Sequence, residues 1–542
     1  MKWSSITLTA AATFCLATAA QAGELIEDFR TPKNIMFAGL MGGSSHINWV
    51  LNIVDELAER GHNVTYLTRD DHARFGKPYP RIKTLSIGPQ AKHLSKVAKK
   101  ISTMSMMQMV KVMMNAMTVN YVEEYHAYIE AYKKNNIDLV ICDHFLVACI
   151  DAATNANIPF IVSMSMPLAK DASSPYTNDE IFTRFHPTTL EESFATRFYN
   201  RIISPFHMMW NANTELKGLA KVRESMGVKN AKGPLDAAWG DSVKIVNTVF
   251  GLEPARPRGP LVELVGPIIP RGYTPLTEEL QQFLDSHQRV AYIAFGQHAA
   301  ATTDSLVKIM IALLENIEKG HLDGFMWATV SSTENFPETV TTSSKKTYKV
   351  ADMFNNVDPH ARMVKWAPQY AVLHHPSTVM FVSHGGAGSL HEALFAGKRL
   401  AIFPFFGDQP GSAWNVEHNG LGRKFNRFTP QHEMIKVIED VALDKDGRYQ
   451  ANVERYKALV QIHSRHGVMR GADTVEEITF MHQNGKIPHR YEVARQMSYI
   501  KAHNLDLYAV ALVILISPFI ALYKLTPTIA KKIHLTNKMK KL

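Results

Sequence analysis

The residues with the clearest capacity for chemistry are a histidine and an aspartate that lie far apart in the chain. His46 follows the small-residue segment Gly42 to Ser45, and Asp143 follows the apolar segment Leu139 to Cys142. An imidazole titrates near neutral pH and can accept a proton from a hydroxyl group, while a neighbouring carboxylate can orient it. A lone loop histidine more often caps a helix or faces solvent, and an aspartate after a strand often caps the next helix. The pair is therefore a catalytic candidate if the fold brings the two side chains together.

Alternating strand and helix patterns identify the elements that would position these residues. The apolar segments that we expect to form strands in the first half are 34–38, 64–67, 139–142 and 159–162. Between the first two, apolar residues recur at helical spacing from Ile47 to Leu57, and Gly61 ends the helix. Strand–helix–strand units favour a parallel sheet, and such sheets bind ligands at the carboxyl ends of their strands. His46 and Asp143 both fall at that edge.

A second α/β domain is indicated by a change in composition near the middle of the chain. Proline and glycine become dense from Gly251 to Pro270, and a helical stretch to Leu284 precedes the apolar strand Val290 to Phe295. Further strand-like runs follow at 325–330, 363–366, 379–382 and 400–404. We therefore expect an α/β fold with two doubly wound parallel-sheet domains facing each other across a cleft.

The N-terminus has the layout of a secretory signal. Lys2 precedes an apolar run from Ile6 to Ala20, and the small-residue site Ala20-Gln21-Ala22 follows. This order of a charged, an apolar and a cleavable region predicts a signal peptide at 1–22.

A single apolar segment near the C-terminus predicts a membrane span. Leu507 to Tyr523 carries no charge and covers most of a hydrocarbon core, so we place one transmembrane helix at 505–525. A buried core helix is the alternative, because the segment has the minimum spanning length and contains Pro518. The basic tail at 526–542 would face the cytosol. Its final lysines resemble a dilysine retrieval signal of the endoplasmic reticulum, although they could instead attract anionic lipid.

The distribution of charge argues against a nucleic-acid-binding protein. The lysines after the apolar run Leu507 to Tyr523 are Lys524, Lys531, Lys532, Lys538, Lys540 and Lys541. They account for six of the nine net positive charges, so the remainder is nearly neutral and we expect no nucleic-acid partner.

Cys142 and Cys149 lie in an apolar stretch and are expected to be buried thiols rather than a bridge. The sequon at Asn63 reads as part of a buried strand, so we expect it to stay unmodified.

The segment Trp366 to Gln409 contains a turn suited to an anion. A strand ending at Ser383 is followed by the small-residue turn His384 to Ser389 and then by a helix. Small residues let backbone amides approach an anion at the positive end of a helix, so this turn could cradle a diphosphate. Most such turns only connect a strand to a helix, and the pattern alone is weak evidence.

The whole of Trp366 to Gln409 resembles the signature of UDP-glycosyltransferases in spacing and in residue types. Val243 to Ile268 and Val290 to Gly296 are similar to the family's interdomain segment and to the first strand of its second domain. The two chain ends resemble those of the glucuronosyltransferase branch of the endoplasmic reticulum. The resemblance implies a GT-B fold, in which the N-terminal half binds the acceptor and the C-terminal half binds the UDP-sugar.

The resemblance also implies roles for individual residues. Those that would hold the donor are Trp366 for uracil, Gln369 beside the nucleotide, His384, Gly386 and Ser389 for the diphosphate, Glu392 for the ribose, and Asp408 and Gln409 for the sugar hydroxyls. Arg256 matches a family arginine that could meet a sugar carboxylate. Two positions depart from the family: Gly388 replaces an asparagine usual in animal enzymes, and Gln297 replaces a phosphate-contacting serine. Donor geometry could therefore differ in detail.

In this family pattern His46 is the base and Asp143 its partner in an inverting transfer. A hydroxyl group is a poor nucleophile at neutral pH, so the reaction needs a base and stabilisation of the departing UDP. We expect no metal and no other cofactor, because no histidine or cysteine ligands cluster in the sequence. The D-x-D triplet Asp444 to Asp446 reads as a surface turn.

The predicted organisation and partners follow. The segments are a signal peptide at 1–22, an N-terminal acceptor-binding domain at 23–270, a C-terminal UDP-sugar-binding domain at 285–450, helices leading to the membrane at 451–504, a span at 505–525 and a basic tail at 526–542. We expect a single-pass type I protein of the endoplasmic reticulum membrane, with luminal catalytic domains and a cytosolic tail. Its partners would be a UDP-sugar and a small lipophilic acceptor, and a homo-oligomer is compatible with the sequence.

Three alternatives stay open. The donor could be UDP-glucuronate or UDP-glucose, and the protein could instead be a catalytically silent, membrane-anchored ligand-binding protein on the same scaffold. The methionine-rich stretch Ile101 to Met117 could mould itself to an apolar ligand or touch lipid, or it could be an ordinary core helix.

Overall fold

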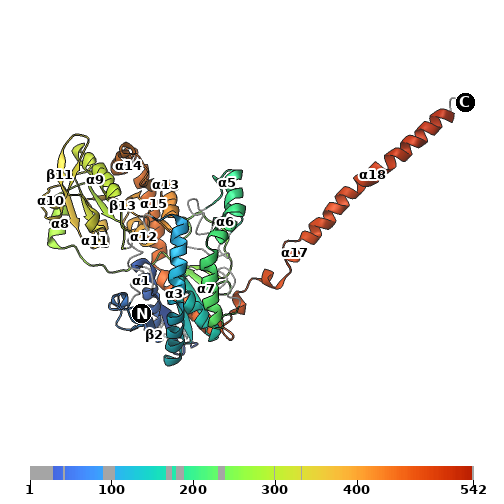
Figure 1. The fold of residues 1–542 in the computed structure, drawn as a ribbon, viewed down its shortest axis with the longest axis horizontal. Coiled ribbons are helices and arrows are strands. Elements are labelled where there is room, and N and C mark those ends of the chain that lie inside the picture. The colour runs from blue at the N-terminus through green and yellow to red at the C-terminus, as the bar shows by residue number, and fades with distance from the viewer. Residues whose placement is uncertain are drawn as a thin grey trace, which may run out of the picture.

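The computed structural model describes two α/β domains and a long C-terminal helix (Figure 1). The described residues are 28–40, 43–89, 104–165, 174–178, 188–229, 239–297, 299–330 and 332–539. The predicted signal peptide and the last three residues lie outside these ranges.

The N-terminal domain is built on a seven-stranded parallel sheet with the order β3-β2-β1-β4-β5-β6-β7. Its strands are β1 (Asn34–Ala38), β2 (Asn63–Thr68), β3 (Lys83–Ser86), β4 (Leu139–Asp143), β5 (Phe160–Met164), β6 (Val243–Val246) and β7 (Val262–Leu264). Its helices are α1 (Ser44–Glu59), α3 (Met106–Lys134), α4 (Val147–Asn155), α5 (Phe194–Phe198), α6 (Ser204–Asn211) and α7 (Asn213–Ser225). The strand order reverses between β1 and β4, and such a reversal opens a crevice at the carboxyl ends of the two strands.

The C-terminal domain contains a six-stranded parallel sheet with the order β12-β9-β8-β13-β14-β15. Its strands are β8 (Val290–Ala294), β9 (Gly324–Ala328), β12 (Ala361–Val364), β13 (Thr378–Ser383), β14 (Arg399–Ile402) and β15 (Gly422–Lys424), with a small antiparallel pair, β10 (Thr339–Thr341) and β11 (Thr347–Lys349). Its helices are α8 (Glu278–Asp285), α9 (Thr303–Glu318), α10 (Val350–Phe354), α11 (Gln369–His374), α12 (Ala387–Phe395), α13 (Gln409–His418), α14 (Gln431–Leu443) and α15 (Arg448–Ser464). The strand order reverses between β8 and β13, so this domain also has a crevice at the carboxyl ends of its strands.

Both sheets are buried on their two faces, which explains why their strands are apolar without alternation. In β1, Ile35 and Phe37 enter one core cluster while Met36 and Ala38 enter another, because successive side chains point to opposite faces. The strands expected from the sequence are present, with ends that differ by a few residues.

A helix after the second domain returns to the first. Val475 and Ile478 of α16 (Gly467–Met481) share a core with α1, and the buried carboxylate of Glu476 receives hydrogen bonds from Arg30 and Arg60. The expectation that residues 451–504 only lead to the membrane is therefore wrong in part, because α16 completes the N-terminal domain.

The chain ends in a long helix that leaves the body (Figure 1). Helix α18 (Leu505–Met539) follows the short α17 (Tyr499–Ala502). The most apolar 18-residue window of its segment Leu505–Leu535 has a mean hydropathy of 2.3, and none of that window is buried. Within the described residues it is the one helix long and apolar enough to cross a membrane. It extends beyond the expected end at residue 525, and the first residues of the predicted basic tail are therefore helical.

Three local expectations are corrected by the structure. Cys142 and Cys149 are buried, as expected, but they form a disulfide, because the turn after β4 folds α4 back and brings the two Cα atoms to 6.0 Å. Asn63 is exposed at the first position of β2, where its amide donates to Asn34. Asp444 is buried rather than at the surface, and its carboxylate accepts from the backbone of Tyr449 at the start of α15.

The methionine-rich stretch contributes to the core. Its described part starts at Met104, and Met109 and Met114 of α3 are buried against the N-terminal domain. Met107 and Met113 are partly exposed. One face of the described part of this helix therefore packs in the core, as expected for an ordinary core helix.

Candidate active site

His46 and Asp143 lie side by side at the reversal point of the N-terminal sheet. His46 occupies the first turn of α1 rather than the preceding loop, and Asp143 is the last residue of β4. Because β1 and β4 are adjacent, their carboxyl ends bring the two side chains to a distance of 2.8 Å between His46 Nδ1 and Asp143 Oδ2. The other carboxylate oxygen, Oδ1, accepts from the backbone amide of Phe145. Both oxygens of Asp143 are thus held in place.

The electrostatics of this pair suit proton transfer. Burial opposes the protonated form of His46, but the charge and hydrogen bond of Asp143 outweigh it and raise the pKa of His46. Burial also opposes the carboxylate of Asp143, yet the charges of His46 and His144 and two hydrogen bonds lower the pKa of Asp143. The side chain of His46 is 18% exposed and that of Asp143 only 2%. The imidazole is therefore the accessible member of the pair.

The turn after Asp143 surrounds His46 with rings. The rings of His144 and Phe145 stack on that of His46 with centroid distances of 5.4 and 5.3 Å. Neither residue is among those expected in the site, although two rings directly after a strand-ending aspartate are a signal for a lined site. His46, Asp143 and His144 also form a group whose ligand atoms lie within 4.8 Å of one another. The expectation of a metal-free reaction stays a prediction.

In the C-terminal domain, His384 lies over the predicted anion-binding turn. A side chain at Gly386 would place its Cβ only 2.4 Å from His384 Nε2, and one at Gly296 would come within 2.9 Å. Gly296 and Gly385 also have positive φ angles, a backbone conformation that residues with a side chain rarely adopt. The helix α12 begins at Ala387, so Ser389 is already helical. The glycines therefore permit the approach of the imidazole to the backbone at the amino end of α12.

Three predicted donor residues form one hydrogen-bonded group. The side-chain amide of Gln369, the first residue of α11, donates to Ser389 Oγ at 3.1 Å and to Glu392 Oε2 at 2.6 Å. Burial raises the pKa of Glu392 to about 7, and the bond from Gln369 partly offsets this. Ser389 and Glu392 lie almost one turn apart on α12, which directs them to the same side. Their shared donor joins α11 to α12.

The remaining predicted donor residues lie at the ends of strands and helices. Trp366 follows β12 and is 61% exposed, so its ring face is available for stacking. Gln409 is buried, and its Oε1 accepts from the backbone amides of Phe405 and Phe406. Arg256 is buried in the segment between the domains and forms an ion pair with Glu253 at 3.2 Å. Its predicted role toward a sugar carboxylate stays a prediction.

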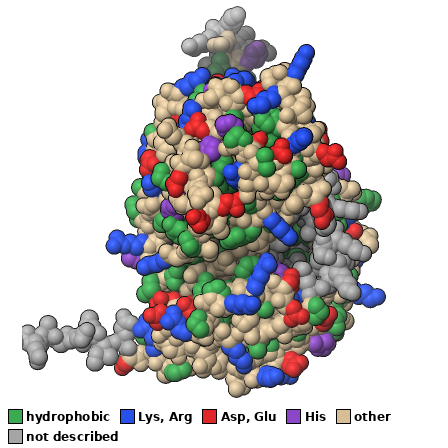
Figure 2. Space-filling model, turned by 90° about the vertical axis from the view of Figure 1, so that its left-hand side faces the viewer, with side chains coloured by type: hydrophobic (Ala, Val, Ile, Leu, Met, Phe, Trp, Pro, Cys, Tyr) green, Lys and Arg blue, Asp and Glu red, His purple; other side chains and the backbone are tan. Residues whose placement is uncertain are grey.

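The two domains meet at the amino ends of α1 and α12. A Cβ at Gly388 would lie 3.5 Å from Cβ of Ser45, the residue before His46. Asp408, at the start of α13, faces the same space, since its charge also raises the pKa of His46. Figure 2 shows the molecule hollowed between its upper and lower halves, with hydrophobic side chains along the rim. His46, the predicted base, and Asp408, a predicted sugar-binding carboxylate, thus interact electrostatically from opposite domains.

Known proteins share both the sequence pattern and the fold. The sequence model of the family described as UDP-glucoronosyl and UDP-glucosyl transferase matches residues 194–541. UDP-glycosyltransferase 1 of Phaeomoniella chlamydospora is 30% identical over 68% of this chain and 76% of its own length. UDP-glucuronosyltransferase 2B7 of Homo sapiens is 22% identical over 95% of this chain and 94% of its own length.

A solved structure supports the architecture. The glycosyltransferase of kitacinnamycin matches with a TM-score of 0.59 at 18% identity, over 83% of this chain and 100% of that one. At this identity the likeness shows the fold alone, and it confirms the expected GT-B arrangement of two parallel-sheet domains.

Proposed function

Because this chain belongs to the UDP-glycosyltransferase family, we propose that it transfers a hexose or hexuronic acid from a UDP-sugar to a hydroxyl group of a small lipophilic acceptor, with inversion. The observation that carries the proposal is the contact of 2.8 Å between His46 and Asp143 beside the cleft. A structural histidine would not need a buried carboxylate at Nδ1 and an accessible ring edge.

The pair performs the proton transfer as follows. With Nδ1–H of His46 donating to Asp143, Nε2 carries the lone pair and accepts the proton of the acceptor hydroxyl. The acceptor oxygen bonds to the anomeric carbon while the bond from that carbon to the UDP oxygen breaks, and UDP leaves as an anion. Asp143 stabilises the imidazolium, and its lowered pKa keeps it ionised throughout.

The second domain holds the donor. Trp366 stacks on uracil, Glu392 accepts from the ribose hydroxyls, and the amino end of α12 with His384 binds the diphosphate. Asp408 receives hydrogen bonds from the sugar hydroxyls, which places the anomeric carbon near His46. No metal is required for these roles.

The acceptor lies against the N-terminal domain. The half-buried ring of Phe145 stacks on His46, and an apolar ring at this place favours an acceptor with a lipophilic body. Only a hydroxyl group near Nε2 of His46 reaches the anomeric carbon.

The catalytic body is anchored in the membrane of the endoplasmic reticulum by α18, with the body in the lumen. Support comes from the exposed apolar surface of this helix and from the lysines that follow its most apolar part. Exposed aromatic residues on α5 and α6, including Phe194, Phe206 and Trp210, add a second surface that suits the interfacial region of a bilayer. Truncation after residue 504 removes the span and leaves only this interfacial surface, so the protein should change from one that only detergent extracts to one that alkaline carbonate strips from the membrane.

The proposal is tested with membranes that carry the full chain. Each of UDP-glucuronate, UDP-glucose and UDP-galactose is offered with a panel of phenols and sterols, while UDP release and product mass are followed. We expect transfer from one donor and a loss of about 100-fold or more in the His46→Ala variant. UDP binding without turnover on any acceptor would favour the silent ligand-binding protein instead.

A further inference from the structure

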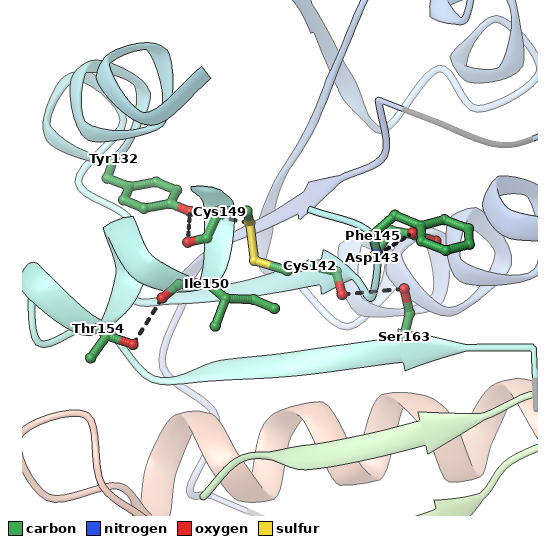
Figure 3. The surroundings of a disulfide bond; sticks show 8 residues. All are labelled: Tyr132, Cys142, Asp143, Phe145, Cys149, Ile150, Thr154 and Ser163. Carbon is green, nitrogen blue, oxygen red and sulfur yellow. Dashed lines mark hydrogen bonds between the residues drawn. A yellow bond between two sulfur atoms is a disulfide. The ribbon is translucent and has the colours of Figure 1, made fainter. Parts of the chain in front are cut away.

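The turn that carries Asp143 is closed by a disulfide. Cys142 is the residue before Asp143 on β4, and Cys149 lies in the first turns of α4. Both cysteines are fully buried. Figure 3 shows the bridge between the strand and the helix, with Asp143 and Phe145 at the end of the strand. The disulfide therefore closes a small covalent loop that contains the six residues between the two cysteines.

This covalent loop contains the groups that contact His46, the proposed base. Asp143 forms a hydrogen bond with His46, and the backbone amide of Phe145 donates to Asp143. The rings of His144 and Phe145 stack on the ring of His46. A turn of this length without a cross-link can adopt other backbone conformations at a modest cost in free energy. Burial opposes the charge of Asp143, and the charges of His46 and His144 with two hydrogen bonds outweigh that effect only while the turn keeps this conformation.

We propose that the disulfide between Cys142 and Cys149 positions Asp143, and through it His46, for the transfer reaction. Cys142 and Cys149 are positioning residues in this assignment, since neither lies at the reacting atoms. The assignment rests on the proposed function, because it gives the bridge a role in that reaction. It also means that full activity depends on an oxidising compartment, where such a bridge forms and persists.

The bridge acts on turnover rather than on donor binding. The predicted donor residues are in the C-terminal domain, whereas the bridged turn belongs to the N-terminal sheet. Opening the bridge should therefore lower kcat while the KM for the UDP-sugar changes little. A displacement of about 1 Å between a base and its substrate can reduce a rate by roughly 100-fold.

The first test counts thiols and needs no activity. The sequence contains three cysteines, and Cys15 falls in the predicted signal peptide, so the mature bridged protein should have no free thiol. Alkylation of the denatured full chain, before and after reduction, should label none and then two cysteines. Two labelled cysteines without reduction would overturn the proposal.

The second test compares bridged protein with the Cys142→Ala/Cys149→Ala variant and with reduced wild type, all as full chains in membranes. We expect kcat to fall about 10- to 100-fold, with the KM for the UDP-sugar within about twofold. The matched control is Tyr132→Phe, which removes the hydroxyl that contacts Cys149 and leaves the bridge intact. This control should keep the wild-type kcat. An unchanged kcat without the bridge would overturn the proposal.

A third measurement reports on His46 without turnover. The rate at which diethyl pyrocarbonate modifies His46, followed by mass spectrometry across pH, gives the pKa of this imidazole. The pKa should lie above 6.5 with the bridge and shift down without it, because Asp143 is the group that raises it. If the shift occurs but no donor supports transfer, the positioning role stands and the proposed function fails. A pKa that does not move without the bridge would refute the positioning role.

Discussion

Nδ1 of His46 lies 2.8 Å from Oδ2 of Asp143, although the two residues are 97 positions apart in the chain. The carboxylate both orients the imidazole and raises its pKa against the opposing effect of burial. In the free protein, the proposed base is therefore protonated at a higher pH than an ordinary histidine. The acid limb of the kcat/KM profile should accordingly lie at a higher pH than an unperturbed histidine would give.

The Asp143→Asn variant separates these two effects. The amide keeps the shape but lacks the charge, so the pKa of His46 falls and its neutral form persists to lower pH. We expect kcat to drop about 100-fold or more, and the acid limb of the kcat/KM profile to move to lower pH. The measurement is the initial rate of UDP release between pH 5 and 9. An acid limb that stays in place would show that Asp143 does not control this imidazole.

The raised pKa of Glu392 predicts that a proton is released when the donor binds. Its pKa of about 7 means that roughly half of the carboxyl groups are protonated at neutral pH in the free protein. Ribose hydroxyls that donate to Glu392 would favour the carboxylate and lower this pKa, so UDP binding near pH 7 should release protons. Calorimetric titration of UDP in buffers with different ionisation enthalpies measures that release. The Glu392→Gln variant should bind UDP more weakly and release no proton from this group.

The two glycines at the start of α12 form a matched pair. Alanine at Gly386 would force the ring of His384 to move, since its Cβ would lie 2.4 Å from Nε2. Alanine at Gly388 would meet only Ser45 at an ordinary contact distance of 3.5 Å. We expect Gly386→Ala to weaken UDP binding by about tenfold, the effect of losing one charge-assisted hydrogen bond. Gly388→Ala should bind UDP as wild type does, and equal losses in both variants would argue against the role of His384.

The docking of α16 on the first domain predicts a stability effect. Burial disfavours the carboxylate of Glu476, but hydrogen bonds from Arg30, His62 and Arg60 outweigh it and lower its pKa. Glu476→Gln should therefore destabilise the protein by about 2 kcal/mol at neutral pH.

The control is Asp473→Asn, which removes an exposed partner of Arg60 and should change stability by less than about 0.5 kcal/mol. Thermal unfolding followed by circular dichroism checks both variants. Because a lowered carboxyl pKa stabilises the fold above its unfolded value of 4.5 and not below its folded value, the difference should fade on acidification. A difference that stays constant as the pH falls below 4.5 would assign the effect to packing.

Most of the fold could be predicted from local patterns. Strands such as Val290–Ala294 are continuous apolar runs because both faces of their sheets are buried. The donor roles predicted for Gln369, Ser389 and Glu392 come instead from the resemblance of Trp366 to Gln409 to a known family. The structure adds that the side-chain amide of Gln369 bonds to both Ser389 and Glu392, which share one face of α12.

The amino-acid sequence by itself determined the two parallel sheets, the apolar C-terminal helix and the residue types of both halves of the site. Only the tertiary structure decided that Asp143 meets His46, that Cys142 meets Cys149 and that α16 returns to the first domain. The physical reason is that these contacts depend on strand order and on the direction in which turns fold, which local periodicity does not encode. The reversal between β1 and β4 brings distant residues to one edge, where the interaction of His46 with Asp143 outweighs burial, raising the pKa of His46 and lowering that of Asp143.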